Sequence, residues 1–91
     1  SPDNASYYNN LGTAYARLGR IPDAIPDFNR AVQINAEYPE AWFSLGRSFS
    51  QVGKYEEAVR PLQTALRLRP NLAPAQMLLR EVQQKLPSQK P

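Results

Sequence analysis

The feature that most constrains this chain is an internal period of 34 residues. When the sequence is shifted by 34 positions against itself, Leu11 and Gly12 fall on Leu45 and Gly46. The same shift superimposes further small and aromatic residues: Gly19 on Gly53, Ala24 on Ala58, Ala31 on Ala65, and Tyr8 on Trp42. A fixed period of this length indicates stacked structural repeats rather than a globular fold built around one active-site cleft.

Apolar residues at three- and four-residue steps predict two helices in each unit. The first helix covers residues 6–18 and ends at Gly19, and the second covers about residues 22–34. The second unit repeats this pattern, with Gly53 after its first helix; both glycines are expected to adopt the left-handed conformation that ends a helix. A fifth periodic segment, about residues 74–86, has no partner helix and carries polar residues on its other side. We therefore expect an all-α chain of antiparallel helix hairpins with about five helices.

Eight positions in each unit carry a resemblance to a known family. An aromatic-x-x-Leu-Gly-x-x-aromatic pattern is formed by Tyr8, Leu11, Gly12 and Tyr15, and again by Trp42, Leu45, Gly46 and Phe49. Later alanine, aromatic, alanine and proline positions fall on Ala24, Phe28, Ala31 and Ala36, and on Ala58, Leu62, Ala65 and Pro70. The pattern resembles the tetratricopeptide repeat (TPR) family, which implies a right-handed α-solenoid.

The repeat register also predicts the organisation of the chain. We assign residues 5–38 and 39–72 to two TPR-like repeats, residues 73–86 to a C-terminal capping helix, and residues 87–91 to a disordered tail. Residues 1–4 are interpreted as the tail of a preceding repeat or a linker. Because the sequence starts without an initiator Met or a signal-like segment, we interpret it as a piece of a longer protein. The sequence does not establish a compartment.

The recurring mid-helix glycines predict close helix packing within each hairpin. A glycine there costs about 1 kcal/mol relative to alanine, so Gly12 and Gly46 imply a gain from packing. We expect Ala24 and Ala58 of the second helices to meet these glycines. The large residues Phe28 and Leu62 are expected to fill the space between successive hairpins.

Two prolines depart from the habits of the family. Pro26 and Pro61 fall inside the predicted second helices, where a proline removes a backbone hydrogen bond. We expect each to delay or kink the start of its helix, and to lie on the side away from Phe28 and Leu62. Pro22, Pro39 and Pro74 fit the first turns of their helices. These five residues are interpreted as structural.

Composition excludes most catalytic chemistry. The chain has no Cys and no His, which removes thiolate and His-dependent nucleophilic systems and nearly every zinc site. The acid pair Asp23 and Asp27, like Glu56 and Glu57, falls at a helix start, where negative charge complements the helix dipole. We therefore predict no enzyme activity, no cofactor and no metal. The apolar runs are too short for a membrane span, so no membrane insertion is expected.

Charge is unevenly distributed along the sequence. The chain has a net charge of +3; residues 1–40 carry three Arg against five acids, whereas residues 41–91 carry eight Lys and Arg against three acids. A basic half could attract nucleic acid, but no aromatic residues alternate with these charges to stack on bases. Nucleic-acid binding is therefore an unlikely function, and a solvated helix face explains the charge better.

The resemblance to the TPR family implies a ligand groove on the concave face formed by the first helix of each pair. By position, this groove contains Ser6, Glu40, Ser50, Leu78 and Glu81, together with the candidate binding residues Asn9, Asn10, Thr13, Arg17, Phe43, Ser44, Arg47, Gln51 and Met77. We expect the Asn10 amide to hold a peptide backbone, since an amide offers both a donor and an acceptor. Phe43 and Met77 are expected to supply an apolar pocket. The predicted ligand is a peptide or a partner protein.

Some family members bind acidic chaperone tails through a clamp of Lys, Asn and Arg. The corresponding positions here hold Asn9, Thr13 and Ser44, or Asn10, Glu40 and Ser44 in a shifted register. Neither register supplies the cations, so the sequence argues against a chaperone clamp.

A structural role in self-assembly is the alternative function. Two units and one closing helix are close to the minimum for a stable array, which generally needs about three repeats. An incomplete end would invite pairing with another copy and produce a homo-oligomer. The apolar edge of the first hairpin, around Tyr7, Ile21 and Tyr55, is the expected contact.

Overall fold

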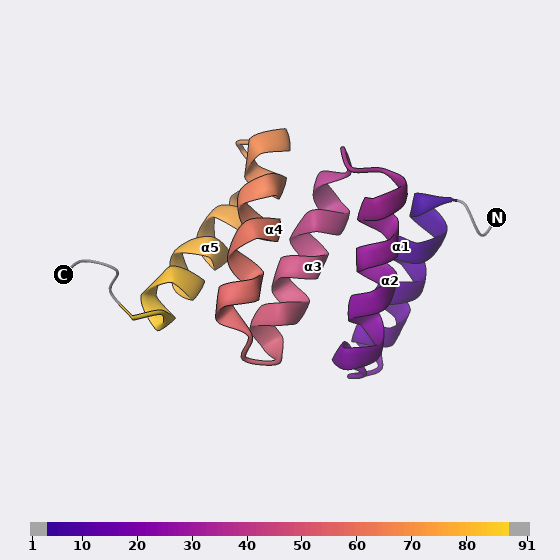
Figure 1. The fold of residues 1–91 in the computed structure, drawn as a ribbon, viewed down its shortest axis with the longest axis horizontal. Coiled ribbons are helices and arrows are strands. Elements are labelled where there is room, and N and C mark those ends of the chain that lie inside the picture. Colours follow the sequence, from indigo (N-terminus) through magenta and orange to yellow (C-terminus); the bar gives the residue numbers. More distant parts are fainter. Residues whose placement is uncertain (1–3, 88–91) are drawn as a thin grey trace.

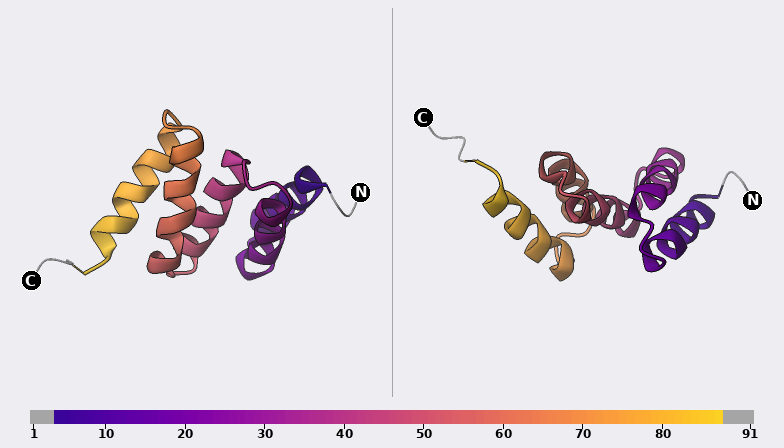
Figure 2. Two further views of the ribbon diagram at one scale, coloured as in Figure 1. Left: turned by 45° about the horizontal axis from the view of Figure 1, so that its top comes forward. Right: turned by 90° about the horizontal axis from the view of Figure 1, so that it is seen from below.

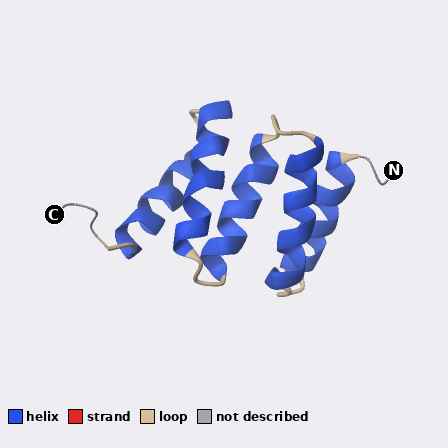
Figure 3. Ribbon diagram, viewed as in Figure 1, coloured by secondary structure: helices blue, strands red, loops and turns tan. Residues whose placement is uncertain are grey.

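The computed structural model describes residues 4–87 and forms an all-α solenoid. Its helices are, in chain order, α1 (Ala5–Arg17), α2 (Ile21–Ile34), α3 (Pro39–Gln51), α4 (Tyr55–Leu68) and α5 (Ala73–Lys85) (Figure 1). α1 and α2 form one antiparallel hairpin, α3 and α4 form the next, and α5 packs against α4. Helices and loops account for all the described residues (Figure 3). Most of the predicted tails, residues 1–3 and 88–91, lie outside the described residues.

The helix ends follow local sequence signals. Gly19 and Gly53 have φ angles of 77° and 81°, so both adopt the predicted left-handed conformation after α1 and α3. At the start of α1, the Asn4 side-chain oxygen accepts a hydrogen bond of 2.8 Å from the backbone N–H of Ser6. Such a cap satisfies one of the amide groups left unpaired at a helix start. The predicted placement of Pro22 and Pro39 in first turns is also confirmed.

The mid-helix glycines make room for one large side chain in each hairpin. A Cβ atom at Gly12 would lie 2.8 Å from Cε1 of Phe28, and one at Gly46 would lie 2.7 Å from Cγ of Leu62. Phe28 and Leu62 are 1% and 0% exposed. Each of these two residues fills the space over the glycine of its own hairpin. Each also belongs to a core cluster that includes residues of the next helix pair or closing helix, so their predicted place between hairpins is compatible with the structure. The backbone of Ala58 is close to Gly46 as well, with its carbonyl oxygen 3.2 Å from that Cβ position.

Both interior prolines lie within continuous helices. α2 begins at Ile21 and α4 at Tyr55, several residues before Pro26 and Pro61, so the predicted late start is wrong. Pro61 is buried beside Leu62, which corrects the prediction that it lies on the far side. A proline removes one backbone hydrogen bond, at a cost of about 3 kcal/mol, and the apolar burial of the α2 and α4 faces offsets that loss.

Each linker between hairpins is closed by a side-chain hydrogen bond. The Trp42 indole Nε1–H donates to the carbonyl of Ala36 at 2.7 Å, across the α2–α3 linker. The Gln76 amide Nε2–H donates to the carbonyl of Pro70, also at 2.7 Å, across the α4–α5 linker. Donors and acceptors in the two linkers are each 34 positions apart. The 34-residue repeat thus includes this hydrogen bond, although a tryptophan donates it in one linker and a glutamine in the other.

Stacking of the hairpins separates the helices into two rows. Figure 2 (right) shows α1, α3 and α5 along one side of the molecule and α2 and α4 along the other. α3 contacts both α1 and α5, so the three first-row helices form one surface. In the part of the chain that the structure describes, no helix is both long and apolar enough to cross a membrane. The ligand groove is predicted on this surface of α1, α3 and α5.

Candidate functional site

A polar pocket lies where α1 and α3 meet on the groove. It has a volume of about 280 Å³ and is lined by Thr13, Ala16 and Arg17 of α1 and by Arg47 and Gln51 of α3. Four of the nine predicted binding residues therefore share one pocket. Arg17 follows Thr13 by four positions, as Gln51 follows Arg47, which places each pair on one face of its helix. Ala16 was not predicted; its small side chain leaves space between the polar residues.

The Arg47 side chain is held by an aromatic ring beneath it. Its guanidinium carbon lies 5.6 Å from the centroid of the Phe43 ring, one helical turn earlier on α3. Phe43 itself is partly buried and packs against the second core cluster, which includes Leu62 and Val82. The ring thus supports Arg47 from below. Met77, predicted to form an apolar pocket with Phe43, is 64% exposed on α5 and does not line the polar pocket.

The two adjacent asparagines of α1 have different environments. Asn10 is exposed, whereas Asn9 is partly buried. The side-chain oxygen Oδ1 of Asn9 is buried and, among the described residues, has no hydrogen-bond partner. The Asn9 backbone carbonyl accepts a hydrogen bond of 2.8 Å from the Thr13 hydroxyl. An unpaired buried acceptor costs free energy, and because this oxygen is shielded from solvent it is not open to a ligand on the surface.

Ion pairing leaves the two arginines of the pocket free. Within residues 4–87 the ion pairs join Arg20 to Asp23 and Arg69 to Glu40. Glu40, predicted to face the groove, therefore has its charge partly neutralised by Arg69. Ser44, the remaining predicted residue, is partly buried, and its backbone carbonyl accepts a 2.8 Å hydrogen bond from the Ser48 hydroxyl.

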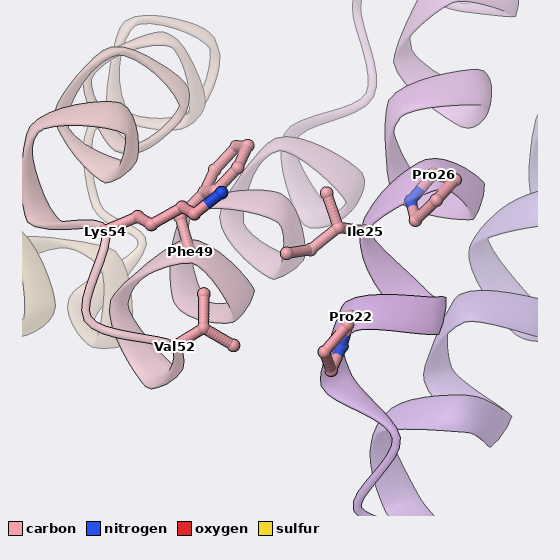
Figure 4. A pocket seen from close by; sticks show the side chains of 6 residues that line it. All are labelled: Pro22, Ile25, Pro26, Phe49, Val52 and Lys54. Atoms are coloured by element: carbon pink, nitrogen blue, oxygen red, sulfur yellow. The ribbon is translucent and has the colours of Figure 1, made fainter.

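A second, apolar pocket lies between the two hairpins (Figure 4). It has a volume of about 270 Å³ and is lined by Pro22, Ile25, Pro26, Phe49, Val52 and Lys54. Its residues come from α2, from α3 and from the α3–α4 linker, and it shares no lining residue with the polar pocket. The sequence reasoning missed this pocket, although two prolines four positions apart next to an isoleucine were visible in it.

The edge predicted for self-assembly is not one continuous surface. Tyr7 is 48% exposed and makes an edge-to-face contact with Tyr8, with the ring centroids 5.1 Å apart. Tyr55, in contrast, packs against the second core cluster, and the Lys85 ammonium of α5 lies 5.7 Å from its ring centroid. Tyr55 thus belongs to the α4–α5 packing, which corrects its assignment to the first hairpin edge. Ile21 is partly buried.

Comparison with known sequences decides the family. The family model described as tetratricopeptide repeat matches residues 3–71. The chain belongs to the tetratricopeptide repeat family. Its five helices fit two TPR repeats and a closing helix.

TPR domains of known structure have the same fold. The first TPR of Spaghetti (RPAP3), solved bound to the HSP90 peptide SRMEEVD, is 34% identical with a TM-score of 0.92, covering 97% of this chain and 70% of that one. The second TPR domain of human RPAP3, solved with the HSP70 peptide SGPTIEEVD, is 27% identical with a TM-score of 0.84, covering 90% and 68%.

Among curated proteins, serine/threonine-protein phosphatase 5 of Rattus norvegicus is 31% identical over 81 residues. The match covers 89% of this chain, but the chain spans only 16% of the length of the phosphatase.

Proposed function

We propose that this TPR chain is a non-catalytic protein-interaction module that binds a peptide, or an extended segment of a partner protein, along the groove of α1, α3 and α5. The observation that carries the proposal is the polar pocket, in which side chains of two different helices converge on the groove. Support comes from the RPAP3 domains, which share this fold and were solved with peptides bound.

The groove offers the groups that a peptide backbone requires. The Gln51 side-chain amide can donate a hydrogen bond to a peptide carbonyl and accept one from a peptide N–H. Met77, exposed on α5, provides an apolar contact at the other side of the groove. Because these groups lie on packed helices, the backbone that carries them does not have to be ordered when a ligand binds.

Catalysis has no part in this proposal. The sequence contains no Cys or His. Asp23, one of the few acids at a helix start, is bonded to Arg20 at 2.8 Å. No group of His, Cys, Asp and Glu within residues 4–87 could hold a metal ion. Self-assembly through the exposed ends, the alternative predicted from the sequence, is not supported within residues 4–87, because Tyr55 belongs to the α4–α5 packing.

The HSP90 and HSP70 peptides bound by the RPAP3 domains both end in EEVD. At the clamp positions of the family this chain has Asn9, Thr13 and Ser44, or Asn10, Glu40 and Ser44 in the shifted register. We therefore expect that an acidic tail would not bind here through a clamp of Lys, Asn and Arg. The arginines of this groove are Arg17 and Arg47, one turn beyond Thr13 and Ser44 in their helices.

Peptide selection from a random display library would test the proposal. Selected peptides should bind the wild-type chain and bind at least about fivefold more weakly to Gln51→Ala, a loss of about 1 kcal/mol. Gln63→Ala, on an exposed position of α4, is the matched control and should bind normally. Circular dichroism would verify that both variants remain folded. Peptides that bind wild type and Gln51→Ala equally, with no loss in Asn10→Ala either, would place binding outside the groove and refute the proposal.

A further inference from the structure

Two arginines line one pocket, and in the part of the chain that the structure describes neither forms an ion pair. Arg17 and Arg47 both line the polar pocket, and none of its lining residues among residues 4–87 is acidic. Over the described residues, the carboxylates in ion pairs, those of Asp23 and Glu40, are bonded to other arginines. Two positive charges in one pocket repel each other. A bound anion would offset this repulsion by attracting both of them.

The donors of the pocket are partly fixed in position before any ligand binds. Arg47 lies over the Phe43 ring, which is itself anchored in the core. The Thr13 hydroxyl hydrogen is already committed to the Asn9 carbonyl. The groups left to donate are therefore the two guanidiniums and the Gln51 amide. Guanidiniums present a planar set of N–H groups that matches the oxygens of a carboxylate or a phosphate.

We propose that this pocket binds an anionic group, a carboxylate or a phosphate, carried by the peptide ligand. The inference rests on the proposed function for the identity of the ligand, but the anion site itself can be tested without it. The ligand class is then an acidic or phosphorylated peptide, whose anion is held at the junction of α1 and α3. Held there, the anion fixes the register of the peptide along the groove.

An NMR titration of the whole chain with inorganic phosphate and with acetate, at constant ionic strength, tests the anion site directly. The side-chain N–H signals of Arg17, Arg47 and Gln51 should shift saturably with at least one of the two anions. The shifts should be lost in Arg47→Gln. Arg60→Gln removes the same charge from an exposed position of α4 and should leave them unchanged. Signals that do not move, or that move equally in Arg47→Gln, would overturn the proposal.

Binding of short peptides distinguishes a carboxylate from a phosphate as the bound anion. It also tests the anion site separately from the proposed peptide binding. The probes are blocked pentapeptides of alanine with a central glutamate, phosphoserine or glutamine. We expect the glutamate or phosphoserine peptide to bind at least about fivefold more tightly than the glutamine peptide, the effect of one favourable charge pair. Equal binding of all three peptides to the groove would overturn the anion site and leave peptide binding standing. Arginine signals that respond to the free anions, while library peptides ignore the groove variants, would leave the anion site standing and refute the peptide function.

Discussion

Substitution of Gly46 by alanine should destabilise the protein, although a change from glycine to alanine stabilises an exposed helix. In an exposed helix, replacing glycine by alanine gains about 1 kcal/mol. Here the added Cβ would lie 2.7 Å from Cγ and 2.9 Å from Cδ2 of Leu62, and 3.2 Å from the carbonyl oxygen of Ala58. Real Cβ contacts are longer than this, so something must move.

The identity of the contacting atoms determines the sign of the effect. Cγ is the branch point of Leu62 rather than its flexible end, and Leu62 is 0% exposed. The Ala58 oxygen belongs to the backbone of α4. Neither can yield without shifting the helix, and overpacking of this kind costs about 1–3 kcal/mol. After the gain in helix propensity is subtracted, we expect Gly46→Ala to lower the free energy of unfolding by about 1 kcal/mol.

A double-mutant cycle with Leu62→Ala makes the test specific. Leu62→Ala alone should cost about 2–5 kcal/mol, because it opens a cavity in a fully buried site. In the double variant, the alanine at position 46 no longer clashes with a leucine at position 62, but its gain in helix propensity remains. The Leu62→Ala step should therefore cost about 2 kcal/mol less in the Gly46→Ala background than in the wild type. Urea unfolding followed by circular dichroism measures all four free energies. If Gly46→Ala stabilises the chain, or if the two substitutions are additive, the glycine does not owe its place to Leu62.

Two further substitutions test the start of α1 and the charge on α2. Asn4→Ala removes the cap on Ser6 and should lower the free energy of unfolding by about 1 kcal/mol, whereas Asn4→Asp, another good capping residue, should keep most of it; equal stability of the two variants in urea would argue against the cap. Burial, and secondarily the Asp23 carboxylate, raises the pKa of Asp27 above its ordinary value of 3.8, so stability should fall as pH rises from about that value through the raised pKa. Asp27→Asn should therefore raise the melting temperature at pH 7 but not at pH 3, and a gain of equal size at both pH values would contradict this assignment.

The repeat made most of the fold predictable. The period, the glycines and the apolar stripes indicated five helices and their ends to within one or two residues. Local rules failed where packing outweighed them. Pro61 was expected to break or delay α4, but it lies three positions after Ala58, on the face that α4 buries. A proline rule concerns the backbone alone and does not include the apolar area that a continuous helix covers.

The candidate site was predictable in its members but not in its grouping. Position in the repeat placed Arg17 and Arg47 on the groove, yet nothing in the sequence showed that they share a pocket. Their convergence depends on how closely α1 and α3 approach, a distance set by the packing of whole hairpins. Tyr55 failed for the same reason, because its cover comes from α5 and not from its neighbours in sequence.

The hydrogen bonds of Trp42 and Gln76 bear on how such repeats can change in evolution. A tryptophan and a glutamine have little in common as packing residues, but each delivers an N–H to the carbonyl six positions earlier. Natural selection on this linker would then act on whether a side chain can donate a hydrogen bond to that carbonyl, and not on its size or hydrophobicity. A repeat that lacks the aromatic residue at its signature position can therefore keep the hydrogen bond that closes its linker.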